Sequence, residues 1–392
     1  MRSAADAVPA GAGVAGFAPS SMITARADIV GSLLRPPGLL RAREALAADS
    51  ITPAAFKAVE DGAVDAAIRL QEEAGLALVT DGEMRRLSFQ SQMTEAVEGF
   101  GEWDLDAFLW GEWHGAAEVG DWRRARPKAL GVVAPLRRRR HLCAEELTYL
   151  RARSTRVAKV TLPSPSLWAN FWSRERSARV YPTLERFLTD VVDILRDEVR
   201  ELARLGATYL QLDAPHYALL VDPRTRAFYE RMGWTVERWL EHGIAMDNAV
   251  IEAAPGVTFG LHVCRGNQGS RWLAAGGYEP IAGPIFRRSG AERLLLEYDD
   301  ARAGSFEPLR EVPDHKTVVL GLVSTKAPRL ETVEELAARV REASRLVPLE
   351  RLALSPQCGF ASSIVGNRLS IDDERRKLAL VVQAATAIWA GV

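Results

Sequence analysis

Two residue types that commonly bind metal ions, His262 and Cys264, are separated by one position in Gly-Leu-His262-Val-Cys264-Arg-Gly-Asn. On an extended strand, side chains two positions apart point to the same side, so the imidazole and the thiol can reach one ion. Glu297 and Cys358 each follow another apolar run. Two thiolates, one imidazole and one carboxylate suit Zn²⁺ in tetrahedral geometry.

These four residues also have explanations that need no metal. A buried free cysteine commonly packs as a small hydrophobic side chain. Glu297 could form an ion pair with Arg265 or Arg302, and the neighbouring Asp299 and Asp300 are rival carboxylate ligands. The spacing alone therefore leaves the metal site open.

The elements that must position these residues are read from the hydrophobic pattern. Short apolar runs without polar alternation predict buried parallel strands separated by amphipathic helices. The expected strands are Asp28–Ser32, Ala77–Asp81, Val157–Leu162, Thr208–Asp213, Val257–Cys264, Leu294–Tyr298, Thr317–Val323 and Arg351–Ser355.

Three stretches predict long helices. Thr52–Ala74 has Thr52 as a cap and Pro53 in its first turn, Thr183–Leu205 has apolar side chains at three- and four-residue spacing, and Thr332–Leu346 opens with Thr-Val-Glu-Glu. Eight strand–helix repeats predict a (β/α)8 TIM-type barrel over residues 21–392, with an insertion at about 99–150 after the second strand. A doubly wound open sheet is the alternative, but no G-x-G-x-x-G follows the first strand. Residues 1–20 are rich in Ala, Gly and Pro, and we expect a flexible leader there.

Active sites of such barrels lie at the C-terminal ends of the strands. Polar residues gather at these predicted positions, where packing alone would favour apolar side chains. They are Ser32, Asp81, Glu83, Asp213, His262, Cys264, Glu297 and Cys358.

Composition narrows the class of protein. The 392 residues are 47% hydrophobic and 26% charged, as expected of a globular chain. Lys and Arg number 50 against 51 Asp and Glu, so no overall positive field favours nucleic acid, and we interpret the run Arg137 to Arg140 as a solvated turn. The sequence contains no uninterrupted apolar run of about 18 residues, so it predicts no membrane span. Three widely spaced cysteines favour a reducing cytoplasm.

Six segments together resemble the cobalamin-independent methionine synthase family, specifically its C-terminal catalytic barrel and the short single-barrel relatives. They follow one another in the family's order from about residue 28 to the C-terminus. They are Val-Gly-Ser32-Leu-Leu-Arg-Pro, Leu-Val-Thr-Asp-Gly-Glu83-Met-Arg-Arg, Leu-Gln-Leu-Asp213-Ala-Pro, Leu-His262-Val-Cys264-Arg-Gly-Asn, Leu-Glu297-Tyr-Asp-Asp and Leu-Ser-Pro-Gln-Cys358-Gly-Phe-Ala-Ser.

The resemblance implies a set of site residues. The family's zinc ligands fall on His262, Cys264, Glu297 and Cys358, and its acceptor is homocysteine, whose thiol joins the zinc. The resemblance places the amino-acid carboxylate of homocysteine at Ser32. Two further residues, Glu83 and Asp213, would hold its ammonium group. A metal-bound thiol is deprotonated, which makes it a nucleophile for a methyl group.

The chain also departs from the long synthases. It lacks their N-terminal half, which helps to hold the folate donor; Val323 stands where they have a proton-donating His, and Ala214 where they usually have Glu. His216 is a candidate for the missing proton donor, with Lys326 as its rival. Trp168 could stack on a flat ring of donor or acceptor, or could be structural.

We therefore expect a zinc-dependent methyl or alkyl transfer to a thiol, with homocysteine as acceptor and a folate or another methyl donor. One alternative is an alkyltransferase or lyase acting on another small thiol or thioether, as in the coenzyme M enzymes that share the barrel. Another is a metal-free barrel of the decarboxylase type. The expected partners are small molecules, with no nucleic acid and no membrane.

Overall fold

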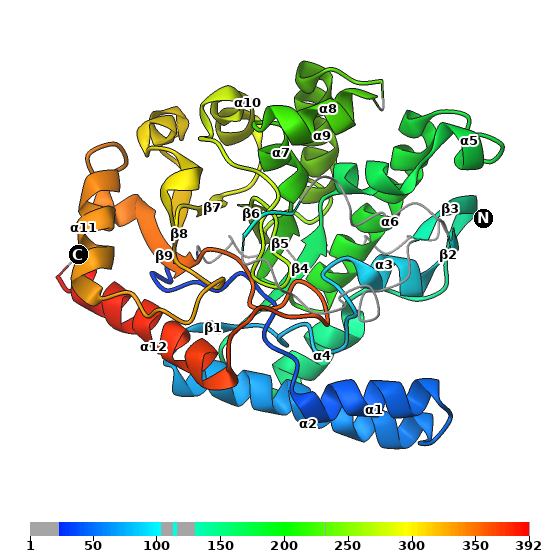
Figure 1. Cartoon of the computed structure of the whole chain (residues 1–392), viewed down its shortest axis with the longest axis horizontal. Coiled ribbons are helices and arrows are strands. Elements are labelled where there is room, and N and C mark those ends of the chain that lie inside the picture. The colour runs from blue at the N-terminus through cyan, green and yellow to red at the C-terminus, as the bar shows by residue number, and fades with distance from the viewer. Residues whose placement is uncertain (1–22, 103–112, 116–129, 232, 392) are drawn as a thin grey trace, which may run out of the picture.

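A curled parallel sheet forms the centre of the protein (Figure 1). The computed structural model describes residues 23–102, 113–115, 130–231 and 233–391. Seven strands pair in parallel in the order β1-β4-β5-β6-β7-β8-β9. Their bounds are β1 Leu78–Val79, β4 Val157–Pro163, β5 Tyr209–Asp213, β6 Thr258–Val263, β7 Arg293–Glu297, β8 Thr317–Val323 and β9 Leu352–Pro356.

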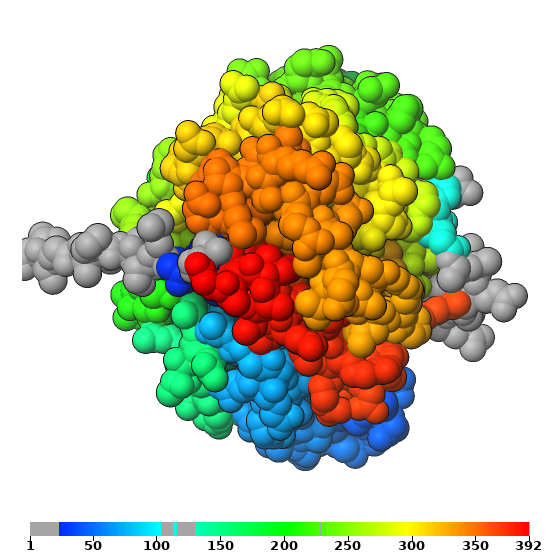
Figure 2. All heavy atoms as spheres, turned by 90° about the vertical axis from the view of Figure 1, so that its left-hand side faces the viewer, coloured from blue at the N-terminus to red at the C-terminus, as the bar shows by residue number. Residues whose placement is uncertain are grey.

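Helices surround the curled sheet (Figure 1). The α-helices are α1 Pro37–Ala47, α2 Pro53–Glu73, α3 Ser91–Ala96, α4 Ala144–Arg153, α5 Arg174–Ser177, α6 Leu184–Arg204, α7 Pro215–Leu219, α8 Pro223–Arg231, α9 Val236–Ile251, α10 Glu279–Arg288, α11 Val333–Ala343 and α12 Ile371–Ile388. Short 3-10 turns are η2 Pro165–Phe171, η3 Ala301–Ala303, η4 Glu307–Glu311 and η5 Leu349–Arg351. In Figure 2, the C-terminal helix α12 (red) lies beside the first of the described residues (blue), and α12 also contacts α2.

The three expected long helices are confirmed as α2, α6 and α11. Each begins after a threonine whose side chain accepts a backbone N–H: Thr52 from Ala55, Thr183 from Arg186 and Thr332 from Glu335. Such caps satisfy donors that have no partner inside the helix. The third helix ends at Ala343, three residues before the expected Leu346.

Seven of the eight expected strands are present in the parallel sheet, and the first differs from the prediction. Around Asp28–Ser32, the described backbone makes only one strand-like bridge, between Ala27 and Leu354 of β9. Side chains take the carbonyls that a neighbouring strand would otherwise use. Lys159 bonds to Ile29, Gln211 to Val30 and Thr80 to Gly31. The segment therefore bridges β9 and the end of β1 without forming a regular strand.

Between β1 and β4, the chain forms a separate antiparallel pair of β2 (Val97–Glu102) and β3 (Leu130–Arg138). The insertion expected at about 99–150 stays a prediction, because residues 103–112 and 116–129 lie outside the described residues, as does the expected leader at 1–20. The arginine run ends β3 and continues beyond it, and Arg137 and Arg139 both pair with Glu98. No helix in the described ranges is long and apolar enough to cross a membrane.

A buried charge network fills the interior at the N-terminal ends of the strands. Asp28 accepts hydrogen bonds from Lys159 (2.9 Å) and Tyr209 (2.9 Å) and pairs with Arg293 (3.1 Å). Asp213 and Glu297 end their strands at the opposite end of the sheet. The interior is thus closed at one end, and the candidate site lies at the other.

Candidate metal centre and pocket

Three of the four expected metal ligands lie together at the C-terminal ends of the strands. Potential ligand atoms of His262, Cys264 and Cys358 all lie within 4.8 Å of one another. His262 is in β6, Cys264 follows that strand by one residue, and Cys358 follows β9 by two. All three are at most 6% exposed. The i, i+2 spacing thus brings His262 and Cys264 to one point, as expected from strand geometry.

The residues fit a metal ion by their chemistry and by their lack of other partners. Within the described structure, neither ring nitrogen of buried His262 has a nitrogen or oxygen partner, and the ring interacts with the Cys358 sulfur. Buried polar groups without partners are rare and costly. Two sulfurs and an imidazole match the ligands that Zn²⁺ prefers.

The sulfurs of Cys264 and Cys358 interact with each other. A hydrogen bond from Cys264, together with one from His262, lowers the pKa of Cys358 well below its usual value. The same hydrogen bond with Cys358, together with burial, raises the pKa of Cys264. One thiolate is thus already favoured at this point, as a cation site requires.

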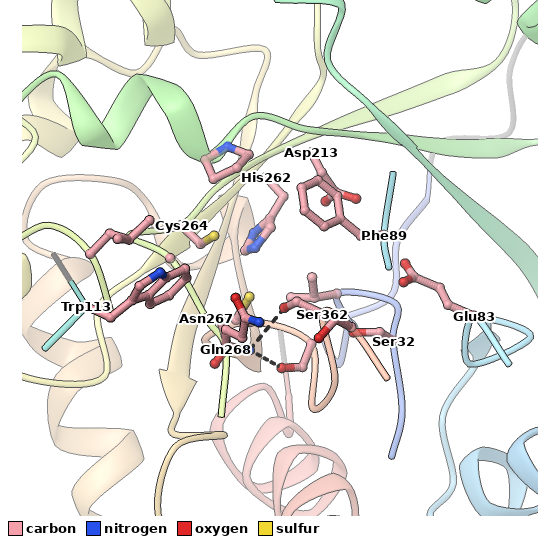
Figure 3. A pocket seen from close by; sticks show the side chains of 17 residues that line it. Ser32, Glu83, Phe89, Trp113, Asp213, His262, Cys264, Asn267, Gln268 and Ser362 are labelled. Atoms are coloured by element: carbon pink, nitrogen blue, oxygen red, sulfur yellow. Dashed lines mark hydrogen bonds between the residues drawn. The ribbon is translucent and has the colours of Figure 1, made fainter. Parts of the chain in front are cut away.

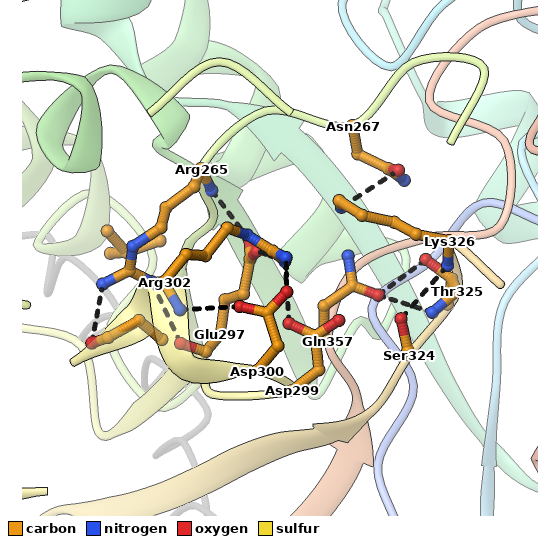
Figure 4. Close-up of polar contacts among 12 residues, drawn as sticks. Arg265, Asn267, Glu297, Asp299, Asp300, Arg302, Ser324, Thr325, Lys326 and Gln357 are labelled. Carbon is orange, nitrogen blue, oxygen red and sulfur yellow. Dashed lines mark hydrogen bonds and ion pairs between the residues drawn. The ribbon is translucent and has the colours of Figure 1, made fainter. Parts of the chain in front are cut away.

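Glu297, the fourth expected ligand, is next to this group but is engaged elsewhere (Figure 4). Its Oε2 accepts the backbone N–H of Arg265 at 2.8 Å, and its Oε1 pairs with Arg302. Burial alone would raise the pKa of Glu297, but the charges of Lys326 and Arg302 outweigh burial and lower the pKa to about 2. The carboxylate is therefore ionised, and it lies at the end of β7 beside β6.

A pocket opens over His262, Cys264 and Cys358, which we call the sulfur–imidazole group. Three expected substrate residues also line it: Ser32, Glu83 and Asp213 (Figure 3). Other lining residues were not predicted from the sequence. They are Val30, Phe89, Trp113, Pro215, Gly266, Asn267, Gln268, Leu273, Gly359, Ser362 and Ser363. Six of them lie in the segments quoted above, namely Val30, Pro215, Gly266, Asn267, Gly359 and Ser362, and Trp113 lies in the insertion expected at about 99–150.

Two carboxylates face this pocket from different elements. Glu83 is 2% exposed, and its Oε2 has no hydrogen-bond partner among the described residues. Asp213 accepts a hydrogen bond from Gln211 at 2.7 Å. Burial, with a smaller contribution from the charge of Glu83, raises the pKa of Asp213 to about 7. Two buried carboxyl groups with spare oxygens are suited to bind a cationic group.

Ser32 lies against Gly359, the residue after Cys358. The Ser32 carbonyl accepts the N–H of Phe360 at 2.8 Å, and a Cβ on Gly359 would overlap the Ser32 hydroxyl oxygen. Glycine is therefore needed at position 359 so that the loop carrying Cys358 can approach Ser32.

His216 and Trp168 do not line the pocket. The His216 Nε2 lies 2.6 Å from the Ser166 hydroxyl, and burial lowers the pKa of the ring to about 3. Trp168 is fully buried and packs against Phe100 and Phe171. The structure thus places both residues in the packing beside the pocket.

Comparison with known protein families decides to which family the chain belongs. The family model described as "Cobalamin-independent synthase, Catalytic domain" matches residues 22–386. The chain belongs to this family. The match spans all the ligand-type residues described above, so the resemblance inferred from the six segments is confirmed.

Individual relatives in the cobalamin-independent synthase family extend over nearly the same length. The uncharacterized protein YxjH of Bacillus subtilis is 32% identical over 369 residues, covering 93% of this chain and 94% of its own. A methionine synthase of Pyrococcus abyssi is 29% identical over 337 residues, covering 85% of each chain. A solved structure from Listeria monocytogenes, described as a candidate vitamin B12-independent methionine synthase, is 26% identical. Its TM-score is 0.67, and the match covers 93% of this chain and 98% of that one.

Proposed function

We propose that this member of the cobalamin-independent synthase family is a zinc-dependent methyltransferase that converts homocysteine to methionine. The observation that carries the proposal is the group of His262, Cys264 and Cys358, whose ligand atoms lie within 4.8 Å of one another beneath a pocket. The methionine synthase name of the Pyrococcus abyssi relative supports the same activity.

We assign zinc to His262, Cys264 and Cys358, with Glu297 as the fourth ligand. This assignment requires Glu297 Oε1 to leave Arg302, while the Arg265 N–H continues to orient Oε2. Zinc held there would keep an incoming thiol deprotonated at neutral pH. Protein groups supply the rest: they hold the acceptor and donor so that the sulfur faces the methyl carbon.

The acceptor's head group is assigned to the polar side of the pocket. Ser32 and the adjoining backbone hold the carboxylate, and Glu83 and Asp213 hold the ammonium by charge-assisted hydrogen bonds. Among the described residues that line the pocket, none is an arginine or lysine. This lining favours an amino-acid thiol over a sulfonate acceptor of the coenzyme M type.

The methyl donor, a folate or another methyl compound, is assigned to the apolar lining residues, which are Phe89, Trp113, Pro215 and Leu273. As the carbon–sulfur bond forms, the bond between the methyl group and the donor breaks. The leaving atom of the donor takes the electron pair and then a proton. Since His216 is neutral and outside the pocket lining, the proposal gives it no part in this proton transfer.

We also propose that residues 21–392 form a single (β/α)8 barrel, in which the segment around Asp28 fills the eighth position between β9 and β1. Its backbone bonds support this place: Asp28 N–H to Leu354 O (2.8 Å) on one side and Leu33 N–H to Gly82 O (3.0 Å) on the other. We also expect a cytoplasmic enzyme, since all three cysteines are free.

The test is direct. The purified chain is analysed for zinc, loaded to one equivalent, and incubated with homocysteine and candidate donors while methionine is followed by mass spectrometry. We expect methionine only with zinc present. Turnover without zinc, or no thioether with any donor, contradicts the proposal, and a metal-free protein would favour the decarboxylase type of barrel.

A further inference from the structure

Glu83 is held in an unusual backbone conformation at the pocket. Its φ is +56°, in the left-handed region that residues other than glycine rarely adopt. The Asp81 side chain accepts the Glu83 N–H at 2.8 Å, which supports this turn. Gly82 precedes it with φ +69°, and a Cβ there would press on Met84, Ala67 and Leu33. Strain of this kind persists only where surrounding contacts enforce it, and it clusters at binding sites.

The Glu83 carboxylate is fixed from one side only. Its Oε1 accepts a 2.7 Å hydrogen bond from the Thr161 hydroxyl, whereas Oε2 is buried without a partner among the described residues. Thr161 comes from β4, far from Glu83 in the chain. One oxygen is thus held by the protein, and the other remains free for a ligand in the pocket (Figure 3).

Arg86 holds Thr161 in turn. Its Nη1 donates to the Thr161 hydroxyl at 3.0 Å, and its Nη2 donates to the Thr161 carbonyl at 2.9 Å. Because the hydroxyl accepts from Arg86, its own proton is directed to Glu83. Arg86 is 1% exposed and Thr161 2% exposed, so the geometry is shielded from water.

The charge of Arg86 is taken up mainly by Glu146, with a longer ion pair to Glu83. The guanidinium binds Glu146 at two points, Nε to Oε1 at 3.0 Å and Nη2 to Oε2 at 2.6 Å, whereas its Nη1 lies 3.6 Å from Glu83 Oε1. Such two-point pairing is the stronger arrangement. The stronger pairing of Arg86 is thus with Glu146, and Glu83 Oε2 has no protein partner among the described residues.

We propose that Thr161 and Arg86, with Arg86 neutralised by Glu146, form a positioning unit that fixes the Glu83 carboxylate for the acceptor's ammonium group. The inference rests on the proposed function, because it takes the acceptor to be an amino-acid thiol. Thr161 and Arg86 do not line the pocket and act through Glu83.

The test removes only the Thr161 hydroxyl. Thr161→Val removes the hydroxyl and keeps the shape of the side chain. Thr161→Ala removes the hydroxyl and the methyl group, and Thr161→Ser keeps a hydroxyl. Calorimetry on the zinc-loaded protein measures the binding of homocysteine and of 4-mercaptobutanoate, which has the same thiol and carboxylate but no ammonium. Zinc content is measured for every variant.

Thr161→Val and Thr161→Ala should each weaken homocysteine binding about 5- to 10-fold, as expected for a lost hydrogen bond. We expect 4-mercaptobutanoate affinity and zinc content to stay within about 2-fold, and Thr161→Ser to recover homocysteine binding. In Glu83→Gln protein, adding Thr161→Val should change homocysteine binding little further, because Thr161 acts through Glu83.

Unchanged homocysteine binding in both variants, or an equal loss for both ligands, overturns the inference and leaves the proposed function in place. If the zinc-loaded wild-type protein binds no homocysteine, the proposed function fails and this inference fails with it.

Discussion

Asp213 and His262 are paired neighbours in the register of β5 and β6, at the ends of the two strands. One carries a carboxylate that faces the pocket, and the other belongs to the sulfur–imidazole group. Adjacent parallel strands lie about 4.8 Å apart, so even a short ligand can reach both residues. This relationship connects the proposed head-group site with the candidate metal centre.

Asp213→Asn should separate these two sites. We expect homocysteine binding to weaken about 10- to 100-fold, because a hydrogen bond to a charged group is lost, while zinc content stays near one equivalent. Calorimetry with homocysteine and elemental analysis of the same sample provide the measurement. An equal loss of zinc and of homocysteine binding would instead indicate a structural role for Asp213.

Cys358→Ser should abolish zinc retention and turnover without unfolding the protein, because Cys358 lies in the loop after β9 and not in the apolar core. Cys143→Ala is the matched control, since Cys143 is a buried free cysteine outside the metal group. Elemental analysis and circular dichroism check both variants. Zinc retained by Cys358→Ser, or lost equally by Cys143→Ala, would remove Cys358 from the ligand set.

Gly359→Ala should weaken homocysteine binding, because the added Cβ forces Ser32 and the Cys358 loop apart. We expect this overlap to lower the stability of the protein by about 1–3 kcal/mol. Gly62→Ala, in the middle of α2 with open space around the added Cβ, is the control. It should raise the free energy of unfolding by about 0.5–1 kcal/mol and leave binding unchanged. If the two variants bind homocysteine equally well, Ser32 and Gly359 do not shape the head-group site.

The stability of the protein should depend on Glu374 as pH changes. Glu374 on α12 is buried and accepts the N–H of Leu34 at 2.9 Å, and burial raises its pKa to about 8. The folded state keeps a proton that the unfolded state releases above its ordinary pKa near 4.5. Stability from this group is therefore complete below about pH 4.5 and falls as pH rises to about 8.

Glu374→Gln removes this titration and keeps an acceptor for Leu34. From pH 5 to pH 9, the difference in melting temperature between wild type and Glu374→Gln should move in favour of the variant. The corresponding change in the free energy of unfolding is up to a few kcal/mol. A difference that stays constant over this range would show that Glu374 titrates normally.

The sequence predicted most of the strands because buried parallel strands are continuous apolar runs. The expected strand Thr317–Val323 has the same bounds as β8. The expected strand at Asp28–Ser32 was wrong for a reason that local sequence does not contain: its carbonyls are bonded by side chains from β4, β5 and the end of β1.

The site was predictable where its members carry distinctive chemistry. His262, Cys264 and Cys358 could be proposed from residue type and spacing. The ion pair of Glu297 with Arg302 was one of the alternatives that the sequence left open, and the structure contains it. Thr161 gave no sequence signal, because its role depends on contact with Glu83, 78 positions away. Long-range contacts of common residue types cannot be read from one sequence.

Our central proposal is that one zinc ion would be bound by the sulfurs of Cys264 and Cys358 and, when homocysteine is present, by its thiol sulfur as well. X-ray absorption at the zinc edge of the loaded protein, with and without homocysteine, tests it most directly. We predict two sulfurs at about 2.3 Å with nitrogen or oxygen at about 2.0–2.2 Å, and three sulfurs after homocysteine is added. Fewer than two sulfurs in the free protein, or no third sulfur with homocysteine, would contradict the account.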